Sequence, residues 1–228
     1  MRRFCTAGFA LALTLSAGAA AAAPAPAFDP PVNAPQEVAT LSGGCFWGMQ
    51  GVFEHVKGVR QVVAGYTGGS AATAQYETVS TGTTGHAESV QITFDPKLIS
   101  YGDILQIFVT VAADPTELDY QGPDSGTQYR SEIWFAPVDQ QQDIARDYLA
   151  QLTKAKAFSS PIVVLLDPAQ AFYPAEGYHQ DFLVLHPDNP YIAYNDLPKL
   201  QALQAQFPQF YMARPVVLTP AAAAVASD

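Results

Sequence analysis

The stretch EVATLSGGCFWGMQGVFEHV, residues 37–56, indicates how the fold begins. Its first six residues predict a short β-strand that runs into two glycines. From Cys45 onward, apolar residues recur at helical spacing; these are Phe46, Met49, Val52, Phe53 and Val56. The sequence therefore predicts a strand, a glycine turn and a helix, with Cys45 at the N-terminus of that helix.

Further strands and helices follow along the chain without a regular βαβ repeat. The sequence predicts strands over 59–66, 87–94, 128–136 and 161–168, and helices over 100–112 and 137–158. The first of these helices opens with a capping-box pattern from Ser100 to Asp103, and Pro137 stands near the start of the second. This order predicts an α+β layered domain with helices packed on a mixed or mostly antiparallel sheet.

Composition limits the possible classes of protein. The chain has 228 residues, of which 49% are hydrophobic and 14% charged, so it can bury a core and is not disordered as a whole. Its formal net charge of -10 provides no basic patch for nucleic acid. We expect one domain over 36–214, preceded by a Pro-rich linker (24–35) and followed by a low-complexity tail (215–228).

The first 23 residues have the pattern of a secretory signal peptide. Arg2 and Arg3 precede an apolar run of small residues that ends in A-x-A cleavage sites. An uncleaved anchor helix is the alternative, but the run turns to alanine and lacks a charged flank. We therefore expect an exported protein that is located in the periplasm. Cleavage would remove Cys5 and leave Cys45 without an intrachain disulfide partner.

A lone cysteine is either buried and inert or reactive. A free thiol has a pKa of about 8.5, and a helix N-terminus contributes only about 0.3–1 kcal/mol, less than one pKa unit. A reactive Cys45 therefore needs further help. Phe46 and Trp47 directly after it are either ordinary core side chains or a wall for a small apolar group, such as a methyl next to sulfur.

Two residues in TGTTGHAESV are candidates for acid–base chemistry. His86 and Glu88 stand two apart at the start of a predicted strand, which would place them on one face. A buried Glu88 would be a general acid with a raised pKa. His86 is a base, a metal ligand or a satisfied polar residue. His55, His179 and His186 are scattered, so we expect no metal site.

Three more polar side chains are candidates because they stand at the borders of loops. Tyr66 in AGYTGG and Tyr129 in DSGTQYR have hydroxyl groups that can hold a substrate oxygen, although packing is the common role of a tyrosine. Asp124 is either a turn residue or the partner of a tyrosine or arginine.

Together these stretches resemble a known family. GGCFWG, AGYTGG, GHAE and DSGTQYRS occur in this order, followed by EGYHQDF and HPDNPYI. They are similar to the peptide methionine sulfoxide reductases of the A type (MsrA), over most of residues 38–200. The resemblance implies a ferredoxin-like α+β fold, a two-layer sandwich, and reduction of the S epimer of methionine sulfoxide in oxidised proteins or peptides.

The resemblance also implies roles for the candidate residues. Cys45 attacks the sulfoxide sulfur, and Glu88 protonates the oxygen that leaves. By the same resemblance, Phe46 and Trp47 hold the S-methyl group, Tyr66 and Tyr129 hydrogen-bond the oxygen, and Asp124 supports the site.

The chain departs from many members of the family because no cysteine follows Cys45. We expect a one-cysteine enzyme with no bound cofactor, whose sulfenic acid is reduced by an external thiol, either a thioredoxin-like protein or a small thiol. A Cys45–His86 hydrolase or acyl transferase is the competing enzyme class. An exported binding module with an aromatic patch is the alternative without catalysis.

Overall fold

The structure, a computed structural model, describes residues 22–137 and 140–218. A six-stranded sheet runs in the order β7-β6-β1-β3-β2-β8, and its strands pair antiparallel except β6 with β7. The strands are β1 (Glu37–Ser42), β2 (Val59–Thr67), β3 (Ala87–Phe94), β6 (Glu132–Phe135), β7 (Leu165–Pro168) and β8 (Tyr173–Pro174). A separate hairpin joins β4 (Tyr120–Gln121) to β5 (Asp124–Ser125).

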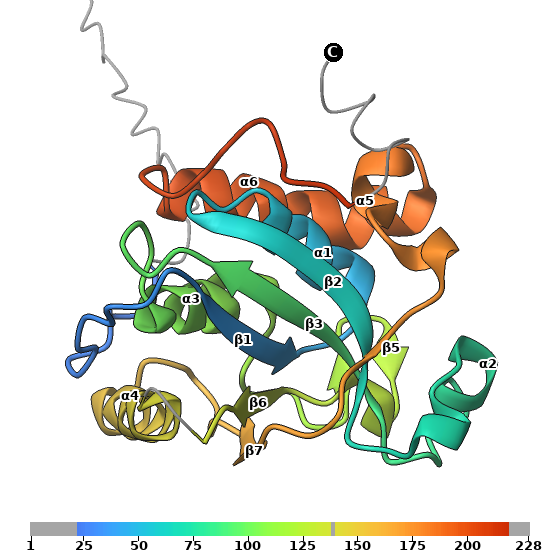
Figure 1. The fold of residues 1–228 in the computed structure, drawn as a ribbon, viewed down its shortest axis with the longest axis horizontal. Helices are drawn as coiled ribbons and strands as arrows, with labels where there is room; N and C mark the ends of the chain where they lie inside the picture. Colours follow the sequence, from blue (N-terminus) through green and yellow to red (C-terminus); the bar gives the residue numbers. More distant parts are fainter. Residues whose placement is uncertain (1–21, 138–139, 219–228) are drawn as a thin grey trace, which may run out of the picture.

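The helices lie against this sheet, with α1, α3 and α6 behind the central strands in Figure 1. They are α1 (Phe46–Glu54), α2 (Tyr76–Val79), α3 (Tyr101–Ile107), α4 (Gln141–Ala155), α5 (Phe182–Leu185) and α6 (Leu197–Gln206). A π-helical turn, Phe108–Ala112, continues α3, and a second, Ile192–Asp196, leads into α6. The expected α+β class with a mixed sheet and packed helices is confirmed.

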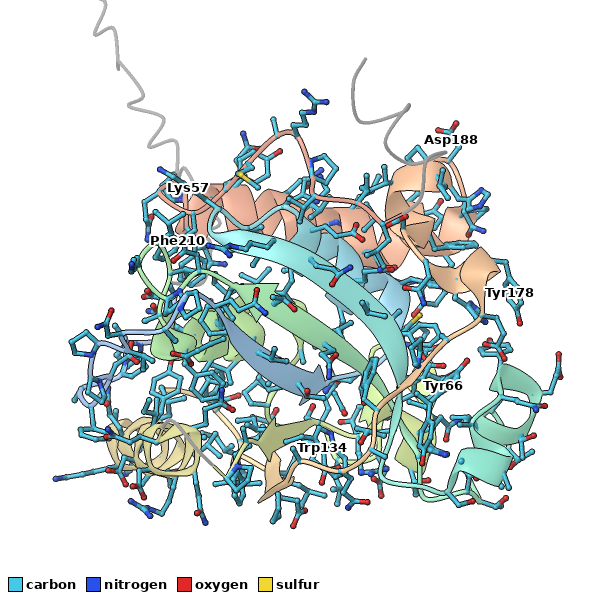
Figure 2. All side chains as sticks on the ribbon, in the orientation of Figure 1. Lys57, Tyr66, Trp134, Tyr178, Asp188 and Phe210 are labelled. Atoms are coloured by element: carbon cyan, nitrogen blue, oxygen red, sulfur yellow. The ribbon has the colours of Figure 1, made fainter. Side chains whose placement is uncertain are left out.

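The core lies between the central strands and the helices, where side chains fill the space (Figure 2). In the antiparallel pair β1–β3, Leu41 stands opposite Val90 and Ala39 opposite Ile92, and all four side chains are fully buried. Met49 and Phe53 of α1 are also fully buried. This packing fixes the β1–α1 turn, and with it the position of the residue that starts α1.

Three predicted elements differ from the observed ones. The helix over 100–112 forms with its capping box, but its second half is the π-helical turn. The strand over 128–136 is shorter, because Thr127–Tyr129 form a 3-10 turn after Gly126, whose φ is 135°. The strand over 161–168 begins only at Leu165. Helix α6 and the turn before it were not predicted.

Both ends of the described chain are attached to the domain. The extended segment after residue 22 docks on α3 and α4, where the Tyr148 hydroxyl donates to Pro24 O at 2.9 Å and Gly102 N donates to Asp29 Oδ1 at 3.2 Å. At the other end, Val216 N donates to Glu54 O at 2.9 Å. The predicted signal peptide and most of the predicted tail lie outside the described residues. Within the described ranges, no helix is long and apolar enough to cross a membrane.

Candidate active site

Cys45 lies between the end of β1 and the first residue of α1, where it occupies the N-cap position. Gly44 precedes it with a φ of +85°, in the left-handed region that favours glycine. A Cβ on Gly44 would also come within 2.6 Å of the Gln121 side chain. The glycine therefore lets the turn pack closely and directs the half-buried Cys45 into a cavity beside the end of β1 and the start of β3, the two central strands.

This cavity, which we call the first cavity, gathers most of the predicted site residues. It has a volume of about 170 Å³ and is lined by Cys45, Phe46, Trp47, Tyr76, Glu88, Asp124, Tyr129 and Tyr191. Six of these were predicted to be at the site. Tyr76 and Tyr191 were missed, and the predicted Tyr66 is not among the lining residues.

Glu88 is the second residue of β3 and is 2% exposed. Its Oε2 accepts a hydrogen bond of 3.0 Å from Phe46 N, in the first turn of α1. Burial raises the pKa of this carboxyl to about 8, although the Phe46 N–H group opposes the shift. Glu88 therefore carries a proton at neutral pH and can act as a general acid.

The environment of Cys45 disfavours the thiolate in the resting site. Burial raises the pKa of the thiol well above its ordinary value, and the negative charges of Glu88 and Asp196 raise it further. The backbone N–H of Trp47 acts in the opposite direction. A thiolate is therefore favoured when Glu88 is neutral, so one proton held on Glu88 serves both the acid and the nucleophile.

The Trp47 ring is fixed on three sides. Its Nε1 donates a hydrogen bond of 3.1 Å to His179 Nδ1. The ring stacks on Phe182, with centroids 3.7 Å apart and planes at 8°, and meets Tyr191 edge-on at 5.8 Å. Phe46 also contacts His179, at 5.0 Å between ring centroids. The two aromatic side chains thus form a rigid apolar wall beside the cysteine.

Tyr66 does not line the first cavity, although its ring lies 5.7 Å from that of Phe46, so its predicted role of binding the substrate oxygen is corrected. Its hydroxyl donates to Glu176 Oε2 at 2.8 Å, and its ring is fully buried. Glu176 Oε1 also accepts from Tyr76 N at 3.0 Å, which anchors the first residue of α2. Tyr66 therefore supports the segment that brings Tyr76 to the cavity. Tyr66 precedes and Tyr76 follows the same glycine-containing polar turn, so local sequence could not choose between them.

Asp124 and Tyr191 form one unit although they lie 67 residues apart. The Tyr191 hydroxyl donates to Asp124 Oδ2. Of the alternatives left open for Asp124, the structure has the one in which it is the partner of a tyrosine, and that tyrosine is Tyr191. Burial raises the pKa values of Tyr129 and Tyr191 above the ordinary range, so both hydroxyls keep their protons. The only sequence signal for Tyr191 was its place in the motif HPDNPYI.

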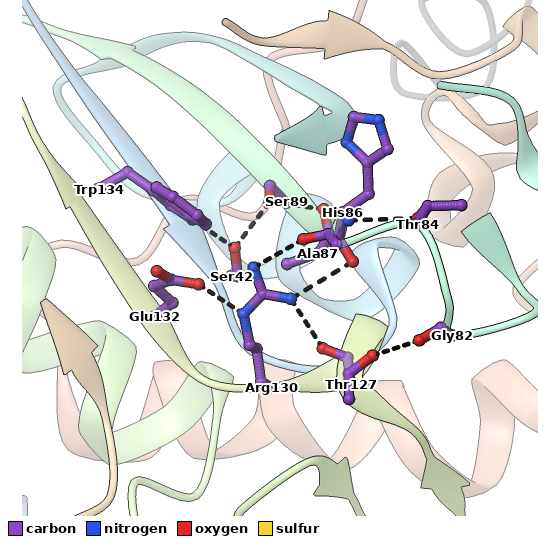
Figure 3. A network of polar contacts seen from close by, with 11 residues as sticks. Ser42, Gly82, Thr84, His86, Ala87, Ser89, Thr127, Arg130, Glu132 and Trp134 are labelled. Atoms are coloured by element: carbon purple, nitrogen blue, oxygen red, sulfur yellow. Dashed lines mark hydrogen bonds and ion pairs between the residues drawn. The ribbon is translucent and has the colours of Figure 1, made fainter. Parts of the chain in front are cut away.

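Arg130 joins the turn that carries Tyr129 to the strand that carries Glu88 (Figure 3). Its Nε is 2.6 Å from Glu132 Oε2, and its other nitrogens donate to the carbonyl oxygens of Gly85, His86 and Thr127 at 3.1, 3.4 and 3.0 Å. One guanidinium group therefore fixes the geometry between two walls of the first cavity.

His86 does not face Cys45. Its Nε2 lies 3.0 Å from Ser70 O, and its ring contacts those of Tyr66 and Tyr173. It precedes the first residue of β3, so the expected shared face with Glu88 does not form. A Cys45–His86 hydrolase has no support in this geometry. The described residues hold no group of three or more potential metal ligands.

The chain was compared with known proteins. The family model described as peptide methionine sulfoxide reductase matches residues 37–210. The peptide methionine sulfoxide reductase MsrA 2 of Mesorhizobium japonicum is 58% identical over 182 residues, which cover 80% of this chain and 93% of the relative. MsrA 2 of a Synechocystis species is 48% identical over 171 residues, covering 75% and 79%.

Solved structures agree with this assignment. Reduced Mxr1 of Saccharomyces cerevisiae matches with a TM-score of 0.60 and 28% identity, covering 72% of this chain and 92% of that one. Methionine sulfoxide reductase A of Corynebacterium diphtheriae matches with a TM-score of 0.57 and 32% identity, covering 68% and 77%. The chain belongs to the peptide methionine sulfoxide reductase family.

Proposed function

We propose that this protein is a peptide-methionine (S)-S-oxide reductase that uses Cys45 as its nucleophile. One observation carries the assignment of roles: a buried Glu88 with a pKa of about 8 lines the same small cavity as the cysteine. A sulfoxide oxygen is a poor leaving group until it is protonated, so a nucleophile and an acid must act together.

The reaction follows from this pair. The Cys45 thiolate attacks the sulfoxide sulfur, and Glu88 gives its proton to the sulfoxide oxygen. The sulfur–oxygen bond of the substrate breaks, methionine leaves, and Cys45 becomes a sulfenic acid. Cys45 loses two electrons and the substrate gains them.

The walls of the first cavity account for choice between epimers. Phe46 and Trp47 offer an apolar surface for the S-methyl group. Tyr76 and Tyr129 are neutral hydroxyl donors for the oxygen, next to Glu88. The methyl group and the oxygen of the substrate then have fixed places, and Cys45 approaches the sulfur from a third side. In the S epimer the rest of the methionine side chain points out of the cavity. In the R epimer the same placement exchanges two groups on the sulfur, so the substrate does not fit.

The catalytic cycle requires an external reductant. Cys45 is the free cysteine of the described residues, and no cysteine follows it in the sequence. The reductant is a thioredoxin-like protein or a small thiol, and no bound cofactor takes part. The substrates are oxidised methionine residues of proteins or peptides, so the reaction repairs oxidative damage.

Export to the periplasm is a further part of this proposal. It is supported by Arg2 and Arg3, by the apolar run after them and by the A-x-A sites before residue 27. Expression of the full chain with a C-terminal tag, followed by N-terminal sequencing of the tagged protein from each cell fraction, tests it. An intact N-terminus in the cytoplasmic fraction would contradict export.

The activity is tested with a methionine sulfoxide peptide whose S and R epimers have been separated. With dithiothreitol as reductant, we expect turnover of the S epimer alone, and no turnover by Cys45→Ser. Turnover that persists in Cys45→Ser, or equal turnover of both epimers, would reject the proposal.

A further inference from the structure

A second cavity opens on the reactive cysteine. It has a volume of about 250 Å³. Its lining comprises Cys45, Val111, Ala112, Ala113, Asp114, Glu117, Gln121, Gly122, Pro123, Asp124, Tyr191, Asn195 and Lys199. Cys45 and the hydrogen-bonded pair Asp124–Tyr191 line both cavities, whereas Glu88 and the aromatic wall line only the first. The sulfur atom is thus reached from two directions.

The reduction of a sulfenic acid requires access to the Cys45 sulfur from a side other than the one that the oxygen occupies. A thiol displaces the hydroxyl group by attacking sulfur along the line of the S–O bond, from the side away from oxygen. On the proposed function, that oxygen comes from a substrate held next to Glu88, in the first cavity. The second cavity also reaches Cys45 but has no Glu88 in its lining, so it offers an approach to the sulfur separate from the oxygen.

We propose that the second cavity receives the reducing thiol, in the form of an aliphatic –CH₂–SH group. This inference rests on the proposed function and extends it. The thiol sulfur bonds to Cys45 Sγ, the S–O bond breaks, and the hydroxyl leaves as water with the proton of the thiol. A second thiol then attacks the mixed disulfide, which releases Cys45 as a thiol and the two reductant sulfurs as a disulfide. Two thiols thereby supply the two electrons.

The cavity is built from fixed groups and opens to solvent. Gln121 Nε2 donates to Asp114 O at 2.8 Å, and Gln121 Oε1 accepts from Asp114 N at 2.9 Å. Asn195 Nδ2 donates to Tyr191 O at 3.0 Å. Asp114 and Pro123 at the mouth are exposed. The second cavity is therefore preformed. A thiol can enter it without any rearrangement of the residues that line the first cavity.

The charges of the lining favour a neutral thiol. Asp114, Glu117 and Asp124 contribute carboxylates. Lys199 is the cation of the lining, and its Nζ lies 3.6 Å from the buried carboxylate of Asp196. A thiol that carries a carboxylate meets net negative charge here, so it should react more slowly than a neutral thiol of similar size.

The test separates the two half-reactions and fills the second cavity with a larger side chain. Val111→Phe fills it from the buried side and Asp114→Trp from the mouth; neither residue belongs to the proposed catalytic machinery. Ser160→Trp, in a separate cavity beside α4, is the matched control. Melting curves verify that each variant is folded. Methionine formed by reduced enzyme without any thiol gives the first rate. The return of the Cys45 thiol after mercaptoethanol is added to the sulfenic form gives the second.

We expect Val111→Phe and Asp114→Trp to slow the second step by at least about tenfold and to leave the first within about twofold of the unchanged protein. The control should change neither step. Equal slowing of both steps would mean that the second cavity binds the substrate. No slowing of either step would mean that the thiol reaches Cys45 by another route. Either result would overturn the inference. A wild-type protein that forms no methionine would instead refute the proposed function.

Two further arms identify the source of the thiol. Reduced thioredoxin in place of mercaptoethanol tests a protein donor. If the two filling variants slow only mercaptoethanol, the cavity admits small thiols alone. Mercaptopropionate, which is carboxylated and of similar size, should react more slowly than mercaptoethanol with the wild type, and Glu117→Gln should narrow that difference. A faster reaction of mercaptopropionate would overturn the charge argument.

Discussion

Replacing Glu88 with glutamine separates the acid from the nucleophile. Glutamine has nearly the same shape, and its amide oxygen can still accept the hydrogen bond that Phe46 N donates at 3.0 Å. The variant should therefore keep the turn that holds Cys45. It loses the proton that the carboxyl holds at neutral pH: with a pKa of about 8, roughly nine in ten Glu88 side chains are protonated at pH 7.

The size of the effect follows from this loss. A positioned general acid contributes about 10²–10⁴-fold to a rate. We expect Glu88→Gln to lower the rate of sulfoxide reduction by that factor, which is about 2.7–5.4 kcal/mol of lost transition-state stabilisation. The thiol should change in the opposite direction. Because the negative charge of Glu88 raises the pKa of Cys45, the variant should be alkylated faster by iodoacetamide above pH 8, where Glu88 of the unchanged protein is ionised, and at nearly the same rate at pH 7.

Two assays on one protein sample test this pair of opposite effects. Methionine formation from the S epimer under single-turnover conditions gives the first, and the rate of iodoacetamide alkylation between pH 7 and 9 gives the second. Tyr101→Phe is the control, since that buried side chain lines neither cavity and its hydroxyl makes no hydrogen bond to the described residues, so it should change neither rate greatly. Reduction within about tenfold of the wild type would refute the role of Glu88 as acid. Slower alkylation would refute the electrostatic link between the two groups.

Other consequences of the structure are open to measurement. Tyr76→Phe should lower sulfoxide reduction by about tenfold or more, because it removes a hydroxyl donor from the first cavity, whereas Tyr66→Phe should not; equal kinetics of the two variants would contradict this. Arg130→Met leaves the buried Glu132 unpaired and should cost about 3–5 kcal/mol in urea unfolding at pH 8. The loss should be smaller at pH 5, because burial raises the pKa of Glu132 to about 7 and a protonated carboxyl needs no cation; a loss independent of pH would argue against this pairing. The cysteine–glutamate pair must lose one of its two protons to react, so kcat/KM should rise by about tenfold per pH unit up to pH 8, and a flat profile between pH 6 and 7.5 would exclude this order of ionisation.

The site residues that are consecutive in the chain could be predicted from the sequence. A strand, two glycines and apolar residues at helical spacing place Cys45, Phe46 and Trp47 at a helix N-terminus, and the structure has that arrangement. Glu88 was found because it lies in an alternating strand next to a glycine-rich turn. Local periodicity determines these positions, so short stretches of sequence are enough.

The remaining residues depend on contacts between distant segments. Tyr76 reaches the first cavity because Glu176, 100 residues later, accepts a hydrogen bond from its backbone. Tyr191 is positioned by Asp124, 67 residues away. No local pattern distinguishes Tyr76 from Tyr66, and the roles assigned to the two could be corrected only from the tertiary structure.

The secondary structure that was missed has a similar cause. Helix α6 has three leucines at helical spacing, Leu197, Leu200 and Leu203, but Leu203 is its one fully buried residue. This apolar stripe is short, and the helix also depends on contacts with α1 and on the π-helical turn before it. The predicted strand over 128–136 is shortened because Arg130 uses its side chain to bind the neighbouring loop and Gly126 turns the chain.

The central claim is that a single cysteine takes the oxygen from methionine S-sulfoxide. Its most direct test mixes the reduced protein with an excess of the S epimer in the absence of any thiol, and then measures both the methionine released and the mass of the peptide that contains Cys45. The account predicts one methionine per chain and one added oxygen atom on Cys45, trapped by a reagent specific for sulfenic acids. Less than one methionine per chain with an unmodified Cys45, or oxygen found on another residue, would contradict it.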